Sequence, residues 1–141
     1  MTTKRESFFK KELVTELREV ARFMKEAKTP EKKIYYLSAA YGITSRTYRY
    51  SFSRDVLLAD FVLIASYQSL MERKRLIKTG DNNVVLDEKI FDAIHKGLLM
   101  LADAFEKENP KTQEALEQIL TASFVASGPG NYLREKSAVT L

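Results

Sequence analysis

The sequence contains no cysteine, only five glycines and only three prolines in 141 residues. Without cysteine, the chain can form no disulfide, no thiolate zinc site, no iron–sulfur cluster and no thiol nucleophile. A chain that needs no disulfide suits a reducing compartment, and we therefore expect a cytoplasmic location.

The sequence also lacks a long apolar run. The longest, residues 56–70, is interrupted by Asp60, Gln68 and two serines, and it is shorter than the roughly 20 residues that a membrane span needs. The opening segment MTTKRESFFKKELV is charged and has no apolar core, so it is unlike a secretory signal. We expect no association with a membrane.

The residues that are present favour helix throughout. Alanine, leucine, lysine and glutamate are plentiful, whereas glycine and proline, the usual punctuation of β-rich chains, are scarce. Hydrophobic residues make up 45% of the chain and charged residues 30%, which is the balance of a globular protein. The length suits one domain, and no shift in composition marks a second, so we predict a single domain over residues 1–141.

Apolar residues that recur every three or four positions predict the helical segments. The stripe of the first segment is Phe9, Leu13, Leu17, Val20, Met24 and Ala27, and that of the fourth is Ile90, Ile94, Leu98, Leu101 and Phe105. We expect helices at about residues 7–28, 30–41, 53–78, from 87 past 105, and 110–126. Thr29-Pro30 and Asn109-Pro110 are start signals, because a capping side chain precedes a proline at the first helical position. Gly42 can end the second helix, although the apolar stripe continues in register and leaves an extension to about Tyr50 open.

The segment 53–78 is apolar nearly all round between Val56 and Ala65, so we expect it to be the central helix. Arg73-Lys74-Arg75 place positive charge near its C-terminus, where the helix dipole favours it. Gly128-Pro129-Gly130-Asn131 predicts a C-cap and turn, followed by a short tail over 131–141. The predicted fold class is all-α, an up-and-down four-helix bundle with an additional short or crossover helix.

The single histidine bears on metal chemistry. Asp92 and His95 lie three residues apart on one predicted helix face, which is half of a carboxylate–histidine metal site. A di-iron bundle needs such a pair from each of two helices plus further glutamates, and one histidine cannot supply them. We predict that His95 sits at the edge of the core, and we predict no metal, no cofactor and no catalytic residue.

Asp60 interrupts the most apolar helix. A carboxylate in that position must be paired, hydrogen-bonded or directed into a cavity. An arginine of the preceding segment, Arg46, Arg49 or Arg54, could reach it. A salt bridge to arginine and a role in a pocket therefore both stand as interpretations.

The densest polar cluster covers residues 44–54 and holds three arginines, five Ser/Thr residues and two tyrosines. Guanidinium groups beside hydroxyls at a helix start suit phosphate or carboxylate recognition, and the tyrosines could stack on a flat ligand. The alternative is a helix connection whose arginines pair with Asp55 and Asp60. The candidate anion-binding site comprises Arg46, Tyr48, Arg49, Tyr50, Arg54 and Asp60.

Two fragments resemble the cobalamin adenosyltransferases, four-helix-bundle enzymes that transfer the adenosyl group of ATP to cobalt. Lys78-Thr79-Gly80-Asp81 resembles their Thr-Gly-Asp nucleotide loop, and Arg46-Thr47-Tyr48-Arg49 resembles their arginine-rich helix motif. The order of the two fragments is reversed relative to the family, and the acidic residue after the arginines is missing. The resemblance implies a bundle, an ATP-using activity as an alternative function, and a site between copies.

Charge is unevenly distributed along the chain. The net charge is +4 overall, but residues 1–78 carry an excess of basic residues and residues 79–141 an excess of acidic ones. Either the basic half binds an anionic partner, such as nucleic acid, or the two halves pair in the fold or between copies. Since glutamates interleave the basic residues and catalytic motifs are absent, we expect a small binding or interaction protein and leave open a homo-oligomer or a phosphate-bearing ligand.

Overall fold

The computed structural model describes residues 4–125, and this part of the chain is helical without a strand. The elements are α1 (Lys4–Glu26), α2 (Pro30–Ser51), α3 (Arg54–Lys78), α4 (Glu88–Glu106), α5 (Gln113–Leu120) and the π-helix η1 (Thr121–Val125). The predicted turn at Gly128-Pro129-Gly130-Asn131 and the tail over 131–141 lie outside the described residues. The all-α prediction is confirmed for residues 4–125.

Three helix starts follow the capping signals of the sequence. The hydroxyl of Thr29 accepts from the backbone N–H of Lys32 at 3.2 Å, with Pro30 as the first helical residue. Ser53 caps α3 and Asp87 caps α4 in the same way. The helix start predicted at Asn109-Pro110 is wrong, because α5 begins only at Gln113. Its N-cap residue, Thr112, makes no side-chain hydrogen bond to the helix.

Helix α2 does not end at Gly42, so the open question about its length is settled in favour of the extension. It ends at Phe52, whose left-handed backbone (φ 51°) allows its N–H to donate to the Tyr48 carbonyl at 2.8 Å. Only Phe52 and Ser53 separate α2 from α3. A bulky residue rarely adopts a positive φ, so the tight hairpin places local strain at Phe52.

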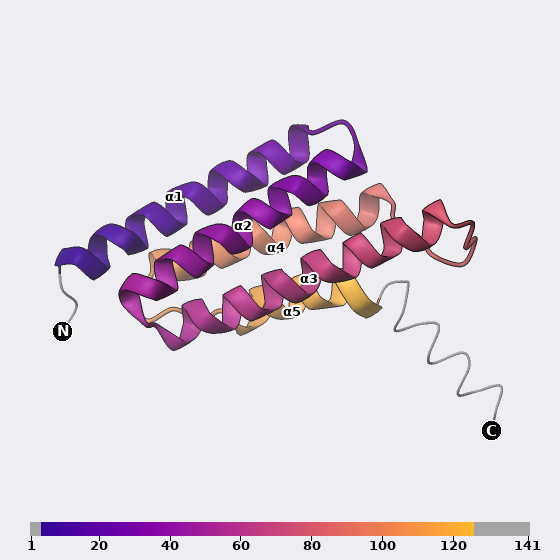
Figure 1. The fold of residues 1–141 in the computed structure, drawn as a ribbon. Coiled ribbons are helices and arrows are strands. Elements are labelled where there is room, and N and C mark those ends of the chain that lie inside the picture. Colours follow the sequence, from indigo (N-terminus) through magenta and orange to yellow (C-terminus); the bar gives the residue numbers. More distant parts are fainter. Residues whose placement is uncertain (1–3, 126–141) are drawn as a thin grey trace, which may run out of the picture.

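The helices run back and forth and surround one apolar core (Figure 1). Helix α1 packs against α2 and α4, and α2 packs against α1 and α3. Direct packing between α3 and α4 is slight, and α5 with η1 fills the seam between them. Within residues 4–125, no helix combines the length and the apolarity that a membrane span requires.

The predicted stripes of α1 and α4 form much of the core. The buried apolar residues shared by prediction and structure are Leu13, Leu17, Val20, Met24, Ile90, Ile94, Leu98, Leu101 and Phe105. The central position predicted for α3 is wrong. Leu63 and Leu70 are fully buried, but Leu58 is 40% exposed and Phe61 is 60% exposed on the opposite side of the same helix.

Ion pairs connect the basic first half of the chain with the acidic second half. Arg18 on α1 bonds Asp103 at 2.8 Å and Glu106 at 2.9 Å on α4, and this pairing lowers the pKa of Glu106. Lys33 is buried, donates to the Met24 carbonyl at 2.8 Å and lies 4.0 Å from Glu88. Part of the charge asymmetry is therefore neutralised inside the fold.

Close packing of α4 on α5 requires a glycine. A Cβ atom added at Gly97 would lie 2.5 Å from the Ile119 Cγ1 atom, whereas one added at Gly42 would meet nothing within 4 Å. Gly97→Ala should lower the free energy of unfolding, because overpacking costs about 1–3 kcal/mol and exceeds the gain in helix propensity.

Gly42→Ala is the matched control, and we expect it to stabilise the chain by about 0.5–1 kcal/mol. Urea unfolding followed by circular dichroism measures both variants. An equal gain in stability from the two substitutions would contradict the close approach of α4 and α5.

Candidate functional site

The six residues of the predicted anion site lie on different sides of the α2–α3 hairpin. Arg46 and Tyr50 face α1, where Arg46 pairs with Glu16. The Tyr50 ring stacks on Phe9 with a centroid distance of 4.4 Å. The guanidinium of Arg5 lies 5.0 Å from the centre of the Tyr50 ring.

Asp60 lies on the side of α3 that faces α2, and Tyr48 follows Thr44 by one turn on α2. The hydroxyls of Thr44 and Ser45 each donate to Oδ1 of Asp60 at 2.6 Å. The arginine partner predicted for Asp60 is not found among residues 4–125, and two α2 hydroxyls take that role instead. The Tyr48 ring meets Phe52 edge-on at a centroid distance of 5.8 Å.

Arg49 and Arg54 are exposed, and their side chains form no hydrogen bond or ion pair within the part of the chain that the structure describes. Successive residues of a helix are rotated by about 100°, so near neighbours in sequence diverge around α2. Arg46 and Tyr50 share one side of the hairpin and Tyr48 and Asp60 share another. None of the six residues lines the hollow at this end of the molecule.

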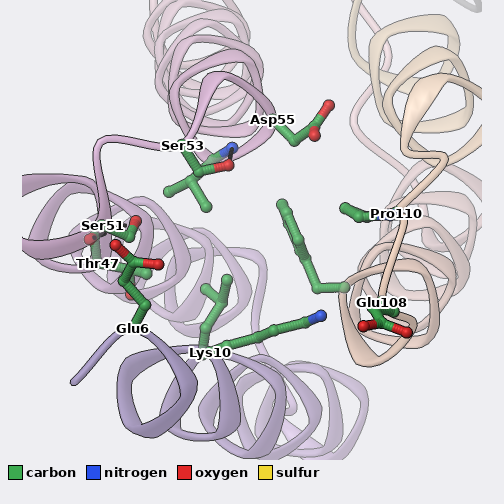
Figure 2. Close-up of a pocket in the computed structure, with 11 residues that line it drawn as sticks. Glu6, Lys10, Thr47, Ser51, Ser53, Asp55, Glu108 and Pro110 are labelled. Carbon is green, nitrogen blue, oxygen red and sulfur yellow. Dashed lines mark hydrogen bonds between the residues drawn. The ribbon is translucent and has the colours of Figure 1, made fainter. Parts of the chain in front are cut away.

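That hollow, of about 190 Å³, opens between the start of α1, the α2–α3 hairpin and the α4–α5 connection (Figure 2). Glu6 lies beside Thr47 and Ser51, and Lys10 extends towards Glu108 (Figure 2). Its lining residues are Glu6, Lys10, Leu13, Thr47, Ser51, Ser53, Asp55, Val56, Phe105, Glu108 and Pro110. They come from three separate parts of the chain, residues 6–13, 47–56 and 105–110, so no local pattern in the sequence connects them.

Four polar side chains of the hollow have structural partners. Thr47 donates to the Ile43 carbonyl at 2.9 Å, and Ser51 donates to the Thr47 carbonyl at 3.0 Å. Ser53 caps α3, and Lys10 donates to the Lys107 carbonyl at the end of α4. These four side chains therefore hold the helix ends around the hollow together. Among residues 4–125 no group of carboxylates and histidine has the arrangement of a metal site.

A buried polar network joins α3 to η1. Ser66, Ser69 and Arg73 lie one turn apart on α3, and all three meet Ser123. The Ser66 and Ser123 hydroxyls are hydrogen-bonded to each other, and the Ser123 carbonyl accepts from Ser69 Oγ at 2.7 Å and from Arg73 Nη2. Burial lowers the pKa of Arg73, and the charge of Asp87 partly offsets this effect.

The burial of Arg73 was missed by sequence reasoning, which placed it with the surface charges at the end of α3. Its side chain is 0% exposed. The spacing Ser66, Ser69, Arg73 follows one helix side, and this was the available signal.

His95 occupies the core edge, as predicted. It is half-buried on α4, and its Nδ1 lies 2.8 Å from the Ala21 carbonyl on α1. This hydrogen bond ties α4 to α1 and gives the ring a structural partner.

Within residues 4–125, an exposed and partly exposed apolar surface runs along the outside of α3. We call it the α3 outer face, and it comprises Leu57, Leu58, Phe61, Ile64, Ala65 and Gln68. Phe61 and Leu58 are its most exposed apolar members. Arg54 lies at one end of this face, and Glu72, which pairs with Arg75, lies at the other.

Comparison with known proteins gives no relative for this chain: no protein-family model, curated protein or solved structure matches it.

The Ser66–Ser123 contact can be measured by a double-mutant cycle. Ser123→Ala leaves the buried Ser66 hydroxyl without its acceptor and should cost about 1–2 kcal/mol of unfolding free energy. Ser66→Ala should cost less, because the Ser123 hydroxyl still donates to the Ile119 carbonyl at 2.8 Å. The double variant should cost clearly less than the sum, because both partners are removed together. Strict additivity in urea unfolding would show that the two hydroxyls do not interact.

Proposed function

We propose that the chain is a protein-interaction module, an up-and-down four-helix bundle closed by α5 that docks a helix of its partner on the α3 outer face. The observation that carries the proposal is the 60% exposure of Phe61 in the middle of that face. Helix-on-groove docking uses apolar anchors spaced by three, four and seven residues, and Leu57, Phe61 and Ile64 have this spacing.

The distribution of apolar residues supports a docking role over accidental exposure. Single exposed apolar residues are common on protein surfaces and need no explanation. Here Leu58 and Phe61 are exposed beside half-buried Leu57, Ile64 and Ala65 over about two turns of one helix. Contiguous apolar surface of this kind marks interaction sites.

The polar groups elsewhere argue for binding over catalysis. The hydroxyls at the end hollow bond to backbone groups, His95 bonds the Ala21 carbonyl, and Asp60 accepts from two hydroxyls. Each candidate nucleophile or base in these groups thus has a structural task. A role as an enzyme has no comparable support.

A photoreactive side chain tests the proposal directly. With p-benzoylphenylalanine in place of Phe61, irradiation of cells that naturally produce the chain should yield a covalent adduct with another polypeptide. The matched control carries the same group in place of Tyr35, which is 67% exposed on α2 and lies away from the α3 outer face. Absence of an adduct at position 61, or equal adducts at both positions, would contradict the proposal.

A phosphate-bearing ligand is the second candidate, and the guanidinium groups of Arg49 and Arg54, which have no ion pair within residues 4–125, favour it. Arg46, by contrast, is engaged with Glu16. The two fragments that resemble the adenosyltransferases lie towards opposite ends of α3, a helix of 25 residues that is about 37 Å long. A nucleotide could therefore contact both fragments only where two copies meet.

Melting with ATP distinguishes this candidate. ATP at 100 times its dissociation constant would add about 2.7 kcal/mol and raise Tm by several degrees. The shift should vanish in Arg49→Ala/Arg54→Ala and persist in Lys89→Ala/Lys96→Ala, which removes two exposed basic residues of α4. If circular dichroism detects no shift for the native chain, the phosphate candidate is wrong.

A further inference from the structure

We infer that the α3 outer face binds a second copy of this chain, with the two α3 helices side by side and antiparallel. This inference rests on the proposed docking role of that face and names its occupant. The pattern of large, small and charged residues along α3 carries the argument.

Four residues of α3 carry the argument, and they lie along one side of the helix. Arg54, Phe61, Ala65 and Glu72 are separated by seven, four and seven residues. At 3.6 residues per turn, Arg54 and Glu72 lie five turns apart on one line, about 27 Å from each other, with Phe61 and Ala65 between them. Leu63 is the midpoint of both pairs, Arg54 with Glu72 and Phe61 with Ala65, and its own side chain points into the core.

A two-fold axis opposite Leu63 brings unlike side chains together. In a symmetric antiparallel pair, positions at equal distances on either side of the axis face each other. Phe61 then packs on the partner's Ala65, and by symmetry Ala65 packs on the partner's Phe61. A large ring against a small methyl lets two helices approach closely, whereas ring against ring would hold them apart.

Charge selects the antiparallel direction. The same symmetry places Arg54 opposite the partner's Glu72 at both ends of the contact. A parallel arrangement in register would instead set Arg54 against the partner's Arg54 and Glu72 against the partner's Glu72, which is unfavourable. Arg54 is exposed and forms no ion pair within residues 4–125, so it is free for this contact.

The size of the face predicts a weak dimer. A stable interface buries about 800 Å² on each partner, and one exposed helix side of about 37 Å supplies less than that. The exposed ring of Phe52 at the adjacent hairpin extends the apolar area. We expect a monomer–dimer equilibrium with a dissociation constant in the micromolar range.

A charge-exchange experiment tests the pairing and its direction. Sedimentation velocity of the purified native chain should show dimer that increases with concentration. Arg54→Glu and Glu72→Arg should each weaken the dimer by about tenfold or more, because like charges then meet at both ends. An equimolar mixture of these two variants should dimerise again, since both ends of the mixed pair carry opposite charges.

The double variant Arg54→Glu/Glu72→Arg should also recover the dimer, and Phe61→Ser should lose it. Arg54 is exposed, and Glu72→Arg removes only the half-exposed Glu72–Arg75 pair, which contributes little to stability, so circular dichroism should show unchanged folding. Failure of the mixture to dimerise would refute the antiparallel pairing.

The outcomes separate this inference from the proposed function. A native chain that stays monomeric at several hundred micromolar, together with a cross-link from position 61 to a different protein, refutes self-association and leaves the docking role intact. A cross-linked species of twice the chain mass together with charge-dependent dimerisation supports both. A monomeric chain that forms no cross-link at position 61 refutes both.

Discussion

The burial of the Arg73 guanidinium is the constraint on which the arrangement of α3 depends. A buried charge is costly unless its surroundings satisfy it, and the loss of a partner costs more than the pair contributes. Arg73 and two serines of α3 converge on Ser123, so the side of α3 that faces the α4 seam is polar. Helix α5 and η1 must therefore lie in that seam, because α3 and α4 scarcely touch.

This polar side leaves α3 with more apolar residues than its inward surface can accept. Leu63 and Leu70 pack in the core, and the seam takes the serines and Arg73. The remaining apolar residues, Phe61 among them, lie outside. The all-round apolar character of α3 thus reflects two separate surfaces, one packed in the core and one exposed, in place of a helix enclosed by the others.

Sequence reasoning succeeded where one local interaction decides the outcome. The caps Thr29, Ser53 and Asp87 and the stripes of α1 and α4 act within a few residues, so they could be recognised in advance. It failed where the partner is distant in sequence. Periodicity shows that α3 has apolar residues on every side, but it does not show which side another helix covers. The burial of Arg73 likewise depends on η1, fifty positions further along the chain.

The candidate anion site shows the same limit of sequence-based prediction, because its surroundings come from distant segments of the chain. Arginines and tyrosines that are close together in the sequence point to different sides of α2. Arg46 pairs with Glu16 of α1, and Tyr50 stacks on Phe9. The hollow at this end is built from segments that no local pattern connects. In a small bundle whose polar side chains have structural partners, exposed apolar surface is the better indicator of a binding site. In residues 4–125 this surface is the α3 outer face, because its exposed apolar side chains gain stabilisation only when another helix covers them.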